Sequence, residues 1–172
     1  KKILVFVRTK VRAERVSKAM ERAGLETVTL HGDKLQEDRI ESLEKFKQGD
    51  CNVLIATDLS ARGIDIQNVE FVINYDLPDV AENYVHRVGR TGRGMQKGRA
   101  FSFCAEEEIP MLREIEVFMQ KEIRVLDIEK SEYTMTLALT EIADSNWQKL
   151  LRDAENEQAV WDKKNPKKNK KK

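Results

Sequence analysis

Three arginines at three-residue spacing, with glycines between them, form the segment whose chemistry is easiest to recognise. They are Arg87, Arg90 and Arg93, within His86–Gly94 (HRVGRTGRG). Guanidinium groups stabilise the charge that develops on a phosphoryl group during its transfer, and glycines let an anion approach the backbone. On a helix the three would share one side, where like charges repel unless an anion lies among them. The segment predicts a phosphate site; the alternative is a solvated basic turn.

A second polar segment, Ala56–Asp65 (ATDLSARGID), directly follows an apolar run. Thr57 and Asp58 offer a hydroxyl and a carboxylate at the end of the predicted strand. Gly63 allows a ligand to approach the backbone closely, and Asp65 is suited to accept hydrogen bonds from a ribose. The alternative is an ordinary helix start, with Thr57 or Asp58 as its N-cap.

Two further polar segments, one around residue 9 and one around residues 31–39, follow the first two apolar runs. Thr9, Lys10 and Arg39 suit the phosphate oxygens of a nucleic-acid backbone. The alternative for each segment is helix capping and surface charge.

The sequence predicts no metal site. The histidines, His31 and His86, and the cysteines, Cys51 and Cys104, have no partners at metal-ligand spacing. We expect each histidine to order a loop by hydrogen bonding, and both cysteines to be reduced, small apolar residues.

Apolar runs alternate with segments of helical spacing, and this pattern predicts an α/β fold with a central, mainly parallel sheet flanked by helices. Ligands of such sheets bind beyond the carboxyl ends of the strands. The strands are expected at residues 3–7, 27–30, 53–56, 69–75 and 100–104, and the helices at 10–23, 35–47, 80–88 and 106–121.

Composition predicts one folded domain with an extension. The chain has 172 residues, of which 35% are charged, and we expect the domain at 1–130. Residues 131–161 are expected to be partly helical or mobile, and 162–172, with seven Lys and one Asp, to be a disordered tail. The rest of the chain then has a net charge of −5.

Several sequence features predict a cytoplasmic protein. The sequence has neither an apolar run of membrane-spanning length nor a signal-peptide pattern. Its abrupt apolar start suggests a piece of a longer chain.

Taken together, the segments resemble the second, C-terminal RecA-like domain of the DEAD-box RNA helicases, over roughly residues 1–125. The order and spacing of the motifs agree with that family. The matching stretches are Ile3–Thr9 for motif IV, Gln36 and Arg39 for motif IVa, Ala56–Asp65 for motif V, Asn74–Pro78 for the linking segment and His86–Arg93 for motif VI.

The resemblance implies a role for each matching residue. Arg90 and Arg93 match the arginines that reach the γ-phosphate of ATP held by the other domain, and Gly63 and Asp65 match positions near the nucleotide and its ribose. RNA-backbone contacts fall on Thr9, Gln36, Arg39, Thr57 and Asp58, and coupling between the domains on Arg62, His86 and Arg87.

The sequence contains neither a GxxxxGK[ST] phosphate loop nor an Asp-Glu-Ala-Asp motif. The resemblance assigns both, and most of the Mg²⁺ coordination, to an N-terminal RecA-like domain of the same chain. We therefore expect no activity from this segment alone. The expected partners are that domain, the RNA backbone with little sequence specificity and, through the Lys-rich tail, the ribosome or structured RNA. The stretch Asn146–Leu151 resembles the extension of RhlE-type bacterial members.

Two other functions fit parts of the pattern. One is a DNA helicase or translocase of the same superfamily, but HRVGRTGR and NYDLP favour the RNA-acting group. The other is a non-enzymatic RNA-binding module, which has no need for arginines that face a γ-phosphate.

Overall fold

The computed structural model describes residues 1–62, 64, 66, 69–92 and 98–126. The chain divides into two compact units, Lys1–Val125 and Leu126–Lys172. Every described helix and strand belongs to the first unit. The extension and tail expected at 131–161 and 162–172 lie outside the described residues.

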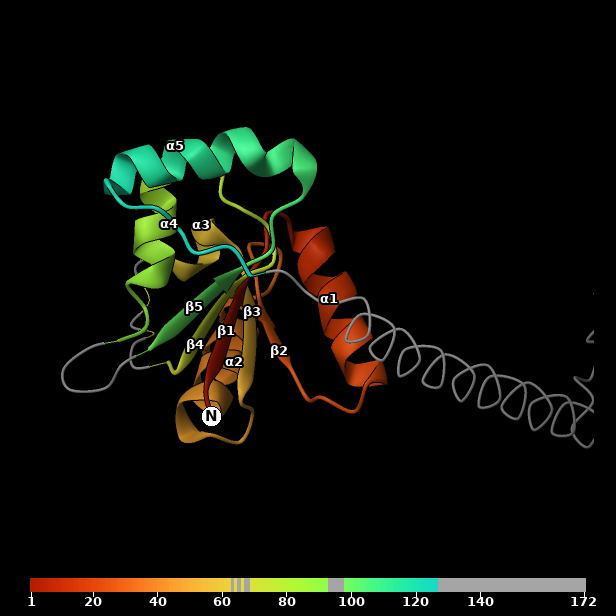
Figure 1. The fold of residues 1–172 in the computed structure, drawn as a ribbon. Helices are drawn as coiled ribbons and strands as arrows, with labels where there is room; N and C mark the ends of the chain where they lie inside the picture. Colours follow the sequence, from red (N-terminus) through yellow and green to blue (C-terminus); the bar gives the residue numbers. More distant parts are fainter. Residues whose placement is uncertain (63, 65, 67–68, 93–97, 127–172) are drawn as a thin grey trace, which may run out of the picture. The chain divides into compact units, whose positions relative to one another are not determined.

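A five-stranded sheet forms the centre of the first unit (Figure 1). Its strands run parallel in the order β2-β3-β1-β4-β5, so β1 lies in the middle and the chain crosses over it between β3 and β4. The predicted α/β fold with a parallel sheet is confirmed. The strands are β1 (Ile3–Phe6), β2 (Val28–Leu30), β3 (Val53–Ala56), β4 (Phe71–Asn74) and β5 (Arg99–Ser102).

The helices lie between and after these strands, close to where their apolar spacing predicted them. A short helix after β3 was not predicted as an element, although a helix start there was the alternative interpretation. The expected helix at 106–121 begins with a 3₁₀ turn, Glu106–Glu108, and ends early. The helices are α1 (Lys10–Arg22), α2 (Gln36–Gln48), α3 (Asp58–Ala61), α4 (Ala81–Val88) and α5 (Ile109–Met119).

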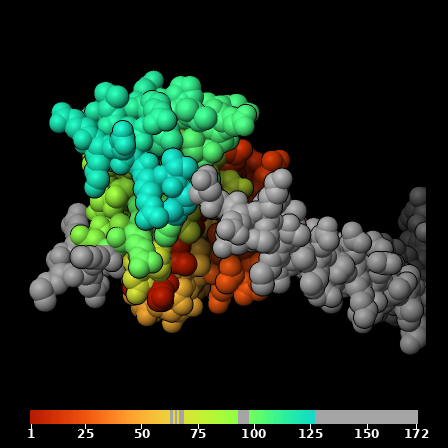
Figure 2. Space-filling view, in the orientation of Figure 1, coloured from red at the N-terminus to blue at the C-terminus, as the bar shows by residue number. Residues whose placement is uncertain are grey.

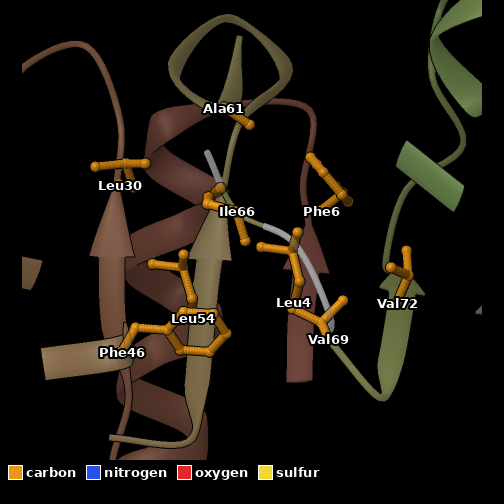
Figure 3. Close-up of a cluster of buried hydrophobic side chains, with 10 residues drawn as sticks. Leu4, Phe6, Leu30, Phe46, Leu54, Ala61, Ile66, Val69 and Val72 are labelled. Carbon is orange, nitrogen blue, oxygen red and sulfur yellow. The ribbon is translucent and has the colours of Figure 1, made fainter. Parts of the chain in front are cut away.

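Alternate residues of the strands bury two opposite faces of the sheet. On one face Leu4 and Leu54 pack with Phe46 of α2 (Figure 3). On the other, Val5 packs with Val16 of α1. Strands buried on both faces explain why β1 and β3 read as continuous apolar runs.

A third apolar cluster joins α4 and α5 near the carboxyl ends of the strands. Leu77, Tyr84 and Ile115 are buried in it. In Figure 1 α5 crosses above the end of the sheet where the strands terminate, and Figure 2 shows it as a continuous green to turquoise ridge. This end of the sheet carries the polar segments that the sequence singled out. No helix within the described residues is long and apolar enough to cross a membrane.

Candidate functional site

Two of the polar segments and the linking stretch Asn74–Pro78 leave adjacent strands at one end of the sheet. Phe6, the last residue of β1, is in register with Ala56 at the end of β3 and with Asn74 at the end of β4. Because the strands are parallel, the segments after them begin side by side. The sheet thus brings together residues that lie far apart in the sequence.

Arg87 is the buried centre of this end of the sheet. It is 1% exposed. Its guanidinium donates to both carboxylate oxygens of Asp58, at 2.6 and 2.7 Å. It also donates to the Asp76 carbonyl oxygen at 2.7 Å and to Asn74 Oδ1 at 3.3 Å, and it lies 5.1 Å from the centre of the Phe6 ring. Arg87 therefore fastens α4 to the ends of β3 and β4, and its hydrogen-bonding capacity is used inside the protein.

Arg90 follows three residues later and has a different environment. The helix ends at Val88, and turn hydrogen bonds from Arg90 N to Arg87 O and from Thr91 N to Val88 O follow it. The shared helical side considered for the arginines therefore does not extend from Arg87 to Arg90, because the chain leaves the helix between them. Arg90 is partly exposed, and Nη1 donates to the Ile64 carbonyl oxygen at 3.2 Å.

A cavity of about 260 Å³ lies beside Arg90. Arg62 donates to Asn83 Oδ1 across its wall at 3.0 Å, and exposed His86 lies 3.9 Å from Glu82. Arg87 neutralises the one carboxylate among the described residues of this wall, Asp58, so the guanidinium groups of Arg62 and Arg90 leave a net positive charge that suits an anionic ligand. The cavity is lined by Phe6, Asp58, Ala61, Arg62, Asn83, His86, Arg87 and Arg90.

Thr91 and Gly92, which follow Arg90, lie close to Val69 before β4 and to Gly98 before β5. Thr91 Oγ1 donates to the Val69 carbonyl oxygen at 2.5 Å. A Cβ atom at Gly98 would collide with Thr91 Oγ1 and lie 2.6 Å from the Gly92 nitrogen, so only glycine fits there. Three predicted site residues, Gly63, Asp65 and Arg93, lie outside the described residues.

The residues predicted to contact RNA lie at helix starts, and most are open to solvent. Thr9 is exposed, and its Oγ1 caps α1 by accepting from Arg12 N at 3.2 Å, which leaves its own proton available. Gln36 is exposed at the first position of α2. Arg39, one turn later, has a buried Nε for which the described residues provide no hydrogen-bond partner. Lys10 forms an ion pair with Asp33 at 2.6 Å.

Thr57 and Asp58 behave as the helix start that was the alternative interpretation. Thr57 is the N-cap of α3, and its Oγ1 lies 2.9 Å from Ser60 Oγ. Ser60 in turn lies 2.6 Å from the Leu30 carbonyl oxygen, so α3 is tied to the end of β2. The carboxylate of Asp58 is held by Arg87.

His31 joins the end of β2 to α1. Its Nε2 lies 2.8 Å from Glu14 Oε1, which also accepts from Thr29 at 3.0 Å. The hydrogen bond to His31, helped by Thr29 and opposed by burial, lowers the pKa of Glu14 below its usual 4.5. The prediction that His31 orders a loop by hydrogen bonding is confirmed.

Neither cysteine lies at a site that the described residues build. Cys51 is buried, and Cys104 is exposed after β5. Partial desolvation of this exposed thiol, followed by the charge of Glu108, raises the pKa of Cys104. Among the described residues no three His, Cys, Asp or Glu side chains gather as a metal site.

Residues missed by the sequence interpretation complete the arrangement. Asn83 was assigned no role, and neither were Asn74 and Asp76, although both stand in the quoted NYDLP stretch. The sequence signal for Asn74 and Asp76 was their place in that motif. Their contacts could not be read from it, because the residues that they contact are distant along the chain.

Residues 1–95 match the model of the helicase conserved C-terminal domain. The chain belongs to this family, in its DEAD-box group. Similarity to solved structures supports the group. The chain resembles DEAD-box protein SrmB of E. coli, in a structure with regulator of ribonuclease activity A, at 36% identity and TM-score 0.69, covering 73% of this chain and 75% of that one. It resembles a DEAD box protein of Methanococcus jannaschii at 40% identity and TM-score 0.70, covering 73% and 35%.

A curated relative is the ATP-dependent RNA helicase DeaD of Buchnera aphidicola, which is 44% identical over 140 residues. That match covers 81% of this chain and 23% of the relative. The chain thus spans about a quarter of the length of that helicase. The predicted resemblance to the C-terminal DEAD-box domain is confirmed; the RhlE-type resemblance of the extension stays a prediction.

Proposed function

We propose that this helicase domain completes an ATP site whose other half is an N-terminal RecA-like domain of the same chain. In this proposal Arg90 and Arg93 meet the γ-phosphate, and Gly63 and Asp65 lie near the nucleotide and its ribose. The N-terminal domain binds ATP through its phosphate loop and holds most of the Mg²⁺ coordination. The domain alone then has no ATPase activity, because positioning and charge stabilisation need both halves.

The observation that carries the proposal is the contrast between two arginines of one motif. Arg87 is buried and held by the Asp58 carboxylate, the Asn74 amide oxygen and the Asp76 carbonyl. The Arg90 side chain borders the cavity and, among the described residues, makes one hydrogen bond, to the Ile64 carbonyl. A guanidinium with unused donors beside Arg62 and His86 is suited to receive a phosphate.

RNA binding is the second half of the proposed function. Thr9, Gln36 and Arg39 present a hydroxyl, an amide and a guanidinium at the starts of α1 and α2. These groups suit backbone contacts, which carry little sequence information. Thr57 belongs to the same proposed grip, and so does Asp58, whose carboxylate also holds Arg87. Arg62, His86 and Arg87 are proposed to couple the ATP and RNA sites.

The tail and the cellular setting complete the proposal. The lysines of 162–172 favour non-specific affinity for structured RNA or the ribosome by counterion release. Replacing the seven lysines of this tail with Ser should weaken RNA binding by the full-length protein and flatten the salt dependence of that binding.

We propose a cytoplasmic location. Stronger stimulation of the ATPase by DNA than by RNA would favour the DNA-helicase alternative.

The deciding experiment measures RNA-stimulated ATP hydrolysis by the full-length protein carrying Arg90→Ala. We expect the turnover to fall by about 10³-fold, the lower end of what such arginines contribute, with RNA affinity preserved in the absence of nucleotide. Arg99→Ala, an exposed arginine of β5, is the control. Wild-type turnover in Arg90→Ala would exclude its role at the phosphate.

A further inference from the structure

Asp76, in the segment after β4, is a buried carboxylate that the proposed function leaves unused. Its side chain is 5% exposed. Oδ2 accepts from the Arg8 backbone nitrogen at 2.8 Å, and Oδ1 forms an ion pair with Arg12 Nη1. A carboxylate buried this far needs such partners, because an unpaired buried charge is costly.

The carboxylate of Asp76 reaches the proposed RNA contact. Arg12 belongs to the first turn of α1, and its backbone nitrogen donates to Thr9 Oγ1 at 3.2 Å. Asp76 therefore holds both the end of β1 and the first turn of α1, between which Thr9 stands. Moving this carboxylate would move the hydroxyl that is proposed to meet the RNA backbone.

The main chain of Asp76 contacts Arg87. Its carbonyl oxygen accepts from Arg87 Nη1 at 2.7 Å, in the buried cluster that fastens α4. The last turn of α4 leads directly to Arg90. The side chain and the carbonyl of one residue thus contact the supports of the RNA-facing and phosphate-facing groups.

We propose that Asp76 is a positioning residue that couples RNA binding at the start of α1 to the placement of Arg90. The inference rests on the proposed function. Linkage requires that the coupling be reciprocal: if nucleotide tightens RNA binding, RNA tightens nucleotide binding by the same factor. Loss of the Asp76 contacts should lower that factor rather than either affinity alone.

The chain offers a matched control three residues away. Asp79 has the same side chain on the same segment and pairs with Arg8 Nε at 3.1 Å, but its side chain is 74% exposed. Exposed pairs of this kind contribute little, and the pair does not involve α1 or Arg87. Asp76→Asn and Asp79→Asn therefore change charge equally and differ in the contacts they remove.

The experiment measures RNA affinity of the full-length protein with and without the ATP analogue adenylyl imidodiphosphate. We expect Asp76→Asn to bind RNA without nucleotide within about twofold of wild type. The tightening caused by the analogue should shrink by about fivefold or more, the lower limit of typical allosteric coupling. Asp79→Asn should keep the wild-type tightening.

A second variant keeps the proposal testable if Asp76→Asn fails to fold. Arg12→Gln changes a half-exposed side chain and leaves Asp76 bonded to Arg8 N. It should reduce the analogue-induced tightening as Asp76→Asn does, and the double variant should add nothing further.

Two results would overturn the assignment of Asp76: unchanged tightening in a folded variant, or equal loss of RNA affinity with and without the analogue. The latter would show a purely structural role. Absence of any tightening in the wild-type protein would instead overturn the proposed function on which the inference rests.

Discussion

The arginine side of this domain and the side that we propose to face RNA are built in opposite ways. Arg87 is 1% exposed and makes four hydrogen bonds to three partners: the Asp58 carboxylate, Asn74 Oδ1 and the Asp76 carbonyl. Gln36 and Thr9, by contrast, are exposed at helix starts, and Arg39 keeps a buried Nε that no described residue bonds. The first side is satisfied within the protein, whereas the second has polar capacity to spare.

The difference separates residues that build the site from residues that we propose to contact a ligand. Arg87 and Arg90 stand three positions apart in one motif, yet among the described residues Arg87 is bonded to Asp58 and the Asp76 carbonyl, whereas Arg90 donates from its side chain to the Ile64 carbonyl alone and borders the cavity. A motif is therefore not a list of ligand contacts. Asp58 lies on the boundary, since it is proposed to meet RNA and is observed holding Arg87.

The largest expected effect comes from removing the internally satisfied arginine. Arg87→Ala leaves the partly buried Asp58 carboxylate uncompensated and the Asp76 carbonyl without its donor. We expect a loss of about 3–5 kcal/mol in the free energy of unfolding, measured by denaturant unfolding of this domain. Arg90→Ala is the control and should cost less than about 1 kcal/mol. Equal losses would mean that the two arginines do not differ as their contacts indicate.

The next largest effect is expected at Gly98, which packs against Thr91 and Gly92. Gly98→Ala would place a methyl group against Thr91 Oγ1 and the backbone of Gly92. Since backbone must shift, we expect a destabilisation of about 1–3 kcal/mol, as for other overpacked sites. Gly32→Ala is the matched control, because a Cβ there meets nothing within 4 Å. If Gly98→Ala unfolds at the same denaturant concentration as the wild type, the close packing of Gly98 against Thr91 and Gly92 does not constrain the backbone there.

On the RNA-facing side the effect should appear in binding and not in stability. Arg39→Ala removes a half-buried guanidinium whose Nε finds no hydrogen-bond partner in the described part of the chain. We expect unfolding within about 0.5 kcal/mol of wild type. RNA affinity of the full-length protein should fall about tenfold or more, with the salt dependence flattened by about 0.7 in slope. Lys47→Ala, at the other end of α2, should leave both unchanged. A clear loss of stability would mean that Arg39, like Arg87, supports the folded structure instead of binding RNA.

Much of the fold was predictable because its signals are local. Continuous apolar runs give β1 and β3, and helical spacing gives α1 and α2. The predicted bounds of the helices and strands were less exact. Val69 was expected in β4 but forms only an isolated bridge to Thr91. The expected helix at 106–121 ends at Met119, where Gln120 adopts a φ of 53°.

The division of labour within the site could not be predicted in the same way. Three-residue spacing suggested a shared side for the arginines, but that requires a helix continuing beyond Val88, and turn hydrogen bonds replace it. Arg87 is buried because β3 and β4 bring Asp58 and Asn74 to it. Such pairings depend on strand order, which periodicity does not encode. The contacts of Asp76 were unpredictable for the same reason.

The smallest expected effect concerns Glu14 of α1, which pairs with His31 after β2. Its folded pKa is lowered below 4.5, mainly by the hydrogen bond to His31. A lowered carboxyl pKa stabilises the folded state above the unfolded value, and this contribution is lost as pH falls through the folded pKa. With a side chain that is 46% exposed, the contribution should be about 0.5 kcal/mol or less. Denaturant unfolding should therefore show a small deficit for Glu14→Gln at pH 7 that disappears as the pH falls below 4.5. The exposed Glu44→Gln should show no such trend, and a deficit that persisted at pH 3 would mean that Glu14 acts through packing instead of charge.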